Sequence, residues 1–81
     1  MKIYRPNGRC NIVGERVRLL RKHAGLSQEE LAAKIQLEGL DLTQKAVSRI
    51  ETGSRIVSDY ELLYLCRALN VPLWELLPDQ I

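Results

Sequence analysis

The sequence predicts an all-α domain of five short helices behind a basic N-terminal arm. Apolar residues recur at helical spacing, and a Ser or Thr followed by a polar first turn precedes three of the predicted helices. The composition is rich in Leu, has no Phe and shows no alternating β-branched runs, which favours helices over strands. With 81 residues there is room for one compact domain, expected over 12–81.

The first helix is predicted to follow Asn11, a suitable N-cap, and to end near Ala24. Val13, Val17, Leu20 and Ala24 are spaced so that they form one apolar stripe. Residues 1–11 have no periodicity and form the basic arm. Its cations are Lys2, Arg5 and Arg9. The arm is either a loose terminus or an additional contact to an anionic partner.

The second and third helices each begin at a capping residue that is followed at once by a glutamine. Ser27 opens a capping box before a helix expected over about 28–38, and Thr43 caps one over about 44–52. The turn between them, 36–42, is long, and its leucines are expected to fold back onto the core. The buried side of the second helix should comprise Leu31, Ala32 and Ile35, with Leu37 as a further candidate.

Two more helices complete the predicted domain. Ser58 begins the fourth helix with another capping box, and Cys66 lies on its apolar stripe as a buried small hydrophobe. Pro72 suits the first turn of a short fifth helix, and Pro78 ends it. Trp74 in this helix is either a plug in the core or an anchor in an interface with a partner.

The composition gives no support for catalysis or metal binding. The sequence has no Gly-rich phosphate loop and no constellation of a nucleophile with a base. His23 stands alone, and Cys10 and Cys66 lack the spacing of metal ligands. We therefore expect no enzyme, cofactor, metal or small-molecule ligand. No apolar run approaches the roughly 18 residues of a membrane span and no signal peptide is evident, so we expect a cytoplasmic protein without a membrane partner.

Positive charge is concentrated in the first part of the chain. Residues 1–34 contain eight Lys/Arg against three Glu, whereas residues 35–81 contain four Lys/Arg against seven Asp/Glu. This asymmetry suits one face for an anionic partner and another face for a different contact. A random fluctuation in a short chain is the alternative explanation.

The third helix carries side chains suited to reading DNA bases. Its apolar residues point inward, which leaves four polar residues outside, namely Gln44, Lys45, Ser48 and Arg49. Arg pairs with guanine and Gln with adenine in the commonest major-groove contacts, and the first turn of a recognition helix points at base edges. Gln28, at the start of the second helix, and Arg55, after the third, are expected to hold phosphates.

Four strings between Val13 and Leu77 resemble the lambda-repressor-like, or XRE-type, helix-turn-helix family. They are Gly14–Arg21, Gly25–Ala32, Val47–Gly53 and the Leu62…Ala68–Val71 tail. The resemblance implies a five-helix domain that binds DNA as a homodimer to regulate transcription, with contacts at Gln28 and the four outer residues of the third helix. It also implies a structural ion pair between Arg21 and Glu51. The turn over 36–42 is longer than is usual in the family.

The leading prediction is sequence-specific binding of double-stranded DNA by a homodimer that acts as a small, repressor-like transcriptional regulator. The alternative is a helical protein–protein adaptor, or an antitoxin-like module, that does not read bases. A positive surface over the third helix would favour DNA. Burial of the same side chains against another chain would favour the adaptor.

Overall fold

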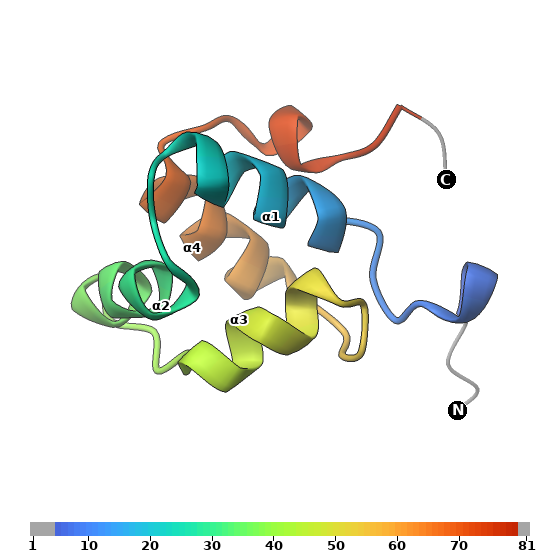
Figure 1. The fold of residues 1–81 in the computed structure, drawn as a ribbon, viewed down its shortest axis with the longest axis horizontal. Helices are drawn as coiled ribbons and strands as arrows, with labels where there is room; N and C mark the ends of the chain where they lie inside the picture. Colours follow the sequence, from blue (N-terminus) through green and yellow to red (C-terminus); the bar gives the residue numbers. More distant parts are fainter. Residues whose placement is uncertain (1–4, 80–81) are drawn as a thin grey trace.

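A computed structural model describes residues 5–79 and confirms the all-α class (Figure 1). The four α-helices are α1 (Gly14–His23), α2 (Gln28–Leu37), α3 (Gln44–Glu51) and α4 (Asp59–Leu69). Two short 3₁₀ helices flank them, η1 (Pro6–Gly8) and η2 (Leu73–Leu76). Residues 5–79 contain no β-strand. The expectation for Lys2 lies outside the described residues.

The helices enclose one core, with α3 on an edge of the molecule. Figure 1 shows α3 along the lower edge, α2 to its left, and α1 above with α4 behind it. The closest helix pairs are α2 with α3 and α1 with α3, and α4 packs on α2 and on η2. The third helix therefore rests on two other helices and leaves its lower side open.

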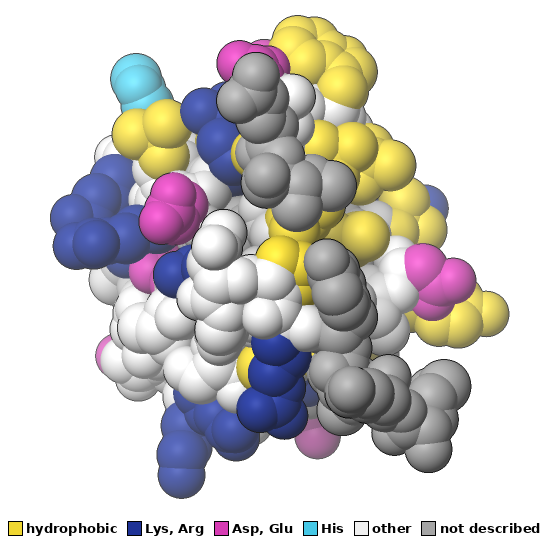
Figure 2. Space-filling model, turned by 90° about the vertical axis from the view of Figure 1, so that its right-hand side faces the viewer, with side chains coloured by type: hydrophobic (Ala, Val, Ile, Leu, Met, Phe, Trp, Pro, Cys, Tyr) yellow, Lys and Arg dark blue, Asp and Glu magenta, His cyan; other side chains and the backbone are white. Residues whose placement is uncertain are grey.

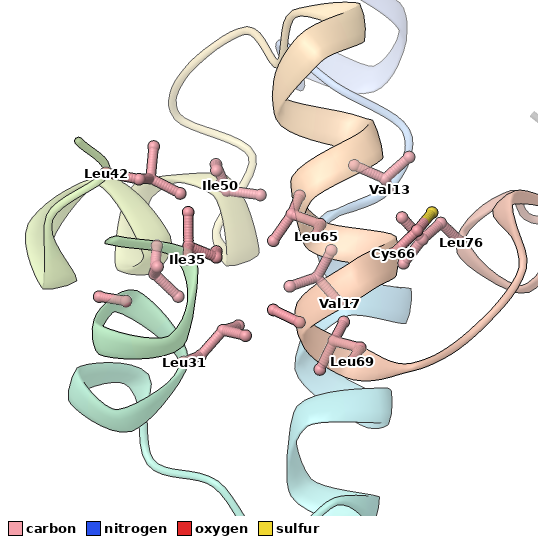
Figure 3. Packing of buried hydrophobic residues seen from close by; sticks show 13 residues of the cluster. Val13, Val17, Leu31, Ile35, Leu42, Ile50, Leu65, Cys66, Leu69 and Leu76 are labelled. Atoms are coloured by element: carbon pink, nitrogen blue, oxygen red, sulfur yellow. The ribbon is translucent and has the colours of Figure 1, made fainter. Parts of the chain in front are cut away.

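Buried aliphatic side chains from all four α-helices form the core (Figure 3). Leu31 and Ile35 of α2 lie on one side with Ile50 of α3, and Leu65 of α4 faces them with Val17 of α1. All five are fully buried. Each such side chain contributes about 1.5–3 kcal/mol through removal of apolar area from water. Because α3 has only eight residues, this packing must supply most of its stability.

Hydrogen bonds at the helix starts follow the local sequence. Ser27 and Ser58 both form capping boxes, and the Thr43 hydroxyl accepts from the Ala46 N–H at 3.1 Å. The start of the first helix is different from the prediction, because α1 begins at Gly14 rather than directly after Asn11. The Asn11 Oδ1 nevertheless accepts from the Val13 and Gly14 N–H groups, so Asn11 caps the helix from farther upstream.

The predicted fifth helix is a single 3₁₀ turn, η2. Only five residues separate Pro72 from Pro78, and the residue before a proline is disfavoured in the α conformation. Leu77 is accordingly extended, with φ −93° and ψ 135°. The segment therefore cannot propagate into an α-helix, although Leu76 still reaches the core.

Two predicted core candidates are wrong. Trp74 is 70% exposed, which excludes the core plug, and Leu37 is 87% exposed at the end of α2. The long turn supplies the buried leucine instead, since Leu42 is 3% exposed and Leu40 packs against the core. The Gln36 side chain closes this turn by donating from Nε2 to the Leu42 carbonyl at 2.8 Å.

Cys66 is buried, as predicted. Desolvation by burial raises the pKa of its thiol, so the thiol stays protonated at neutral pH. Cys66 therefore acts as a small hydrophobic residue of the core.

Candidate nucleic-acid interface

The outer face of α3 presents the residues that the sequence assigned to base contacts. Gln44, Lys45 and Arg49 are exposed, and Ser48 is half-buried. Gln44 lies in the first turn, directly after the Thr43 cap. Among residues 5–79, the Arg49 guanidinium has one hydrogen-bond partner, the Ser54 carbonyl, at 3.5 Å from Nη2. The structure thus brings a glutamine, a lysine and an arginine together on one open helix face.

A buried ion pair fixes the inner face of α3. Arg21 of α1 donates to the Glu51 carboxylate from Nε at 2.6 Å and from Nη2 at 3.0 Å. Its Nη1 donates to the Leu26 carbonyl at 2.8 Å. The hydrogen bond to Glu51 raises the pKa of Arg21 and outweighs the opposing effect of burial. The pair therefore joins α1 to the end of α3, with the guanidinium permanently charged.

Gln28 is also part of this network. Its side-chain Nε2 donates to the Glu51 Oε1 at 3.0 Å, so α2 is tied to the same carboxylate. The side chain is half-buried and engaged within the protein. A phosphate at this position would therefore meet the backbone N–H groups at the start of α2 more directly than the Gln28 amide.

Arg55 is paired within the protein. Its guanidinium donates to both carboxylate oxygens of Glu61, at 3.2 and 3.1 Å, and Glu61 also accepts from the Ser58 N–H in the capping box of α4. A DNA contact by Arg55 would require this pair to open. Contact with the DNA backbone at Arg55 remains a prediction.

The N-terminal arm contributes contacts that the sequence analysis missed. Arg9 donates from Nη2 to the Glu51 carbonyl at 3.3 Å, and the Cys10 N–H donates to the Gly53 carbonyl at 2.8 Å. Asn11 donates from Nδ2 to the Ile50 carbonyl at 3.1 Å. Glycines at positions 14 and 53 are the sequence feature that could have indicated this close approach of the two segments.

An exposed apolar surface lies on α4 and the η2 segment, and η2 packs on α1 and α4 at the edge opposite to α3 (Figure 1). Its members are 40–70% exposed, namely Leu63, Leu73, Trp74 and Leu77. Figure 2 shows hydrophobic side chains gathered at the upper right of one face, with Lys and Arg side chains at its left and along its lower edge. Because the view is turned about the vertical axis, the lower edge in Figure 2 is the α3 edge of Figure 1.

Residues 5–79 offer no group of three or more His, Cys, Asp or Glu side chains that could hold a metal ion. Within the same range, every helix is too short or too polar to cross a membrane.

Comparison with known proteins shows which family the chain belongs to. A family model described as a helix-turn-helix domain matches residues 12–77. No curated protein sequence matches the chain. Among solved structures, the restriction-modification controller protein C.AhdI from Aeromonas hydrophila is 39% identical, with a TM-score of 0.71, and the match covers 79% of this chain and 89% of that one.

Two further structures have the same fold. The DNA-binding domain of BldD is 30% identical, with a TM-score of 0.69, over 83% of this chain and 90% of that one. The clp gene regulator ClgR from C. glutamicum is 25% identical, with a TM-score of 0.70, over 80% and 78%. With the family model covering both helices of the motif and the rest of the core, the chain belongs to the lambda-repressor-like helix-turn-helix family.

Proposed function

We propose that this protein is a transcriptional regulator that binds double-stranded DNA sequence-specifically, as a homodimer, with α3 in the major groove. The outer face of α3 carries the proposal, because Gln44, Lys45 and Arg49 are exposed there while the inner face is fixed in the core. Similar proteins support it by description, since one is a controller protein, one a DNA-binding domain and one a gene regulator.

Each outer side chain of α3 is suited to a particular contact with DNA. Gln44, in the first turn, has the amide that pairs with adenine, and Arg49 has the fork that pairs with the O6 and N7 atoms of guanine. Lys45 can contact a base or a phosphate, and the Ser48 hydroxyl can bond to a donor or an acceptor on a base edge. The N-terminal end of α2, at Gln28, faces a phosphate through its backbone N–H groups.

The apolar surface on α4 and η2 is the proposed dimer interface. The η2 part of this surface packs on α1 and α4 at the edge opposite to α3 (Figure 1), so a second copy packed there would leave the outer faces of both α3 helices exposed. To read a palindromic site, the two α3 helices of the dimer must reach successive major grooves, roughly 34 Å apart. Trp74, exposed and aromatic, is the kind of side chain that anchors interfaces.

Selection of bound sequences from a pool of random duplexes tests the proposal. The wild-type protein should enrich a palindromic site with half-sites about one helical turn apart. Arg49→Ala should weaken binding to that site by about 1–3 kcal/mol and relax the preference at one base pair in each half-site. Arg18→Ala is the control, because it removes the same charge from an exposed position on α1.

Two outcomes would contradict the proposal. Failure of the wild-type protein to enrich any sequence would leave the adaptor function as the better explanation. Equal effects of Arg49→Ala and Arg18→Ala would show that α3 contributes only unspecific charge.

A further inference from the structure

We infer that Arg9–Asn11 form a clamp that positions the C-terminal end of α3 for base reading. The inference rests on the proposed function, because it assigns the clamp a role in DNA recognition by α3. Arg9–Asn11 would then act on specificity from inside the protein, without contacting a base.

The clamp begins at the carbonyl groups that end α3. The last four carbonyls of an α-helix have no partner within the helix. Two of these in α3, from Ser48 and Arg49, accept from backbone N–H groups just downstream. The Ile50 carbonyl accepts from the Gly53 N–H at 3.0 Å and also from Asn11.

The Glu51 carbonyl depends on the arm. Among the hydrogen bonds of residues 5–79, Arg9 Nη2 is its one donor, at 3.3 Å. Arg9 therefore places a positive charge at the negative end of the α3 dipole, where a cation is stabilising. The arm thus completes the C-terminal end of α3 both by hydrogen bonding and by charge.

The clamp continues onto the loop between α3 and α4. The Cys10 N–H donates to the Gly53 carbonyl at 2.8 Å, and Asn11 Nδ2 donates to the Arg55 carbonyl at 2.9 Å. The two segments approach so closely that glycine is required at position 14, where the neighbour is backbone, and Gly53 is favoured by its φ of +77°. A Cβ added at Gly14 would lie 2.2 Å from the Ile50 carbonyl oxygen, and one at Gly53 would lie 2.8 Å from the Arg9 guanidinium carbon.

The Asn11 side chain both caps the start of α1 and binds the chain at and after the end of α3. Its Oδ1 accepts from the Val13 and Gly14 N–H groups at the start of α1, while its Nδ2 donates to the Ile50 and Arg55 carbonyls. The start of α1 and the end of α3 therefore share one side chain. A displacement of α3 along α1 would break these bonds together, so the clamp fixes where α3 presents its outer face.

A positioning role and a direct phosphate contact by Arg9 predict different results. Loss of a phosphate contact weakens binding to all sequences about equally and reduces the salt slope by about one. Loss of positioning weakens binding to the selected site, because base contacts depend on distance and angle, and leaves unspecific binding and the salt slope unchanged.

The experiment compares Asn11→Asp and Arg9→Ala with the wild-type full chain. Asn11→Asp keeps the acceptor that caps α1 but turns a carboxylate oxygen toward two carbonyls, so it breaks only the clamp. Arg5→Ala is the control for charge, because it removes one cation from an exposed position of the same arm. Each protein is titrated with its selected duplex and with a scrambled duplex at two salt concentrations, and thermal unfolding confirms that it is folded.

Both clamp variants should lose about three- to tenfold in affinity for the selected duplex, the effect of one or two lost hydrogen bonds, and keep wild-type affinity for the scrambled duplex. Should Asn11→Asp fail to fold, Arg9→Ala decides the outcome alone. An equal loss on both duplexes with a reduced salt slope, or wild-type discrimination in Arg9→Ala, overturns the clamp while the proposed function stands. Absence of any selected duplex for the wild-type protein overturns both.

Discussion

Glu51 alone is bonded to three other segments of the chain. Its carboxylate accepts from Arg21 of α1 and from Gln28 of α2, and its carbonyl accepts from Arg9 of the arm. The Glu51 side chain is 3% exposed, so its charge has little contact with water. A buried carboxylate is tolerated only when its partners are all in place.

Replacing Glu51 by Gln should be strongly destabilising. The Gln side chain keeps the shape but leaves the Arg21 guanidinium buried without a counter-charge, which costs about 3–5 kcal/mol. Urea unfolding followed by circular dichroism measures this loss. Arg16→Ala is the matched control, because the Arg16–Glu75 pair is about one-third exposed and should contribute about 0–1 kcal/mol. Similar losses in both variants would refute a special role for the buried pair.

The outward position of the α3 residues could be predicted because helical periodicity alone decides it. Gln44 and Arg49 lie outside since Val47 and Ile50 must lie inside. The partners of other residues could not be predicted. Gln28 reaches a carboxylate 23 positions away, a distance along the chain over which no local pattern carries information.

At the scale of elements, the helix starts were predictable and several ends were not. A capping box is a local motif of four residues, so Ser27 and Ser58 could be recognised from sequence. The start of α1 depends on Asn11, whose side chain also binds the loop after α3. The pairing of Arg55 was not predictable either, because its partner Glu61 is the carboxylate that already serves the capping box of α4.

The capping box of α2 predicts a pH dependence. A hydrogen bond from the Ser27 backbone N–H, helped by the Ser27 side chain, lowers the pKa of Glu30. The folded state thus favours the charged carboxylate. This stabilisation is fully present above the ordinary glutamate pKa of about 4.3 and is lost as the pH falls through the lowered pKa.

Glu30→Gln should therefore weaken the acid dependence of stability. Its urea midpoint should change less than that of the wild-type protein as the pH is lowered from about 5. Glu29→Gln, at the exposed neighbouring position, is the control and should retain the wild-type profile. Parallel pH profiles for Glu30→Gln and the wild-type protein would show that the capping carboxylate does not titrate with folding.

At the scale of the whole molecule, charge and apolar surface are separated. The exposed cations of α3 lie on one edge of the molecule, and the exposed apolar side chains lie on α4 and on η2, which is at the opposite edge (Figure 1). The sequence leaves open whether Trp74 points into the core or toward an interface. The short η2 turn between two prolines explains the outcome, because it directs Leu76 inward and leaves Trp74 outside.

Dimerisation through this face can be tested with one exposed residue. Trp74→Asp should convert a wild-type dimer into a monomer at micromolar concentration, because it places a charge in a desolvated interface. Its thermal stability as a monomer should change little, since Trp74 is 70% exposed. Sedimentation equilibrium gives the mass. Leu37→Asp is the control, since Leu37 is also exposed but is the last residue of α2, outside the proposed interface. A monomeric wild-type protein, or equal dissociation by both variants, would refute this interface.

The ties that converge on Glu51 have a thermodynamic consequence for binding. A recognition segment that is disordered before binding must lose its backbone freedom when it binds, and that loss reduces affinity. The eight residues of α3 lose this freedom when the domain folds, because both the inner face and the C-terminal end are already held. The free energy of contact with a ligand is then available for affinity and for discrimination rather than for ordering the helix.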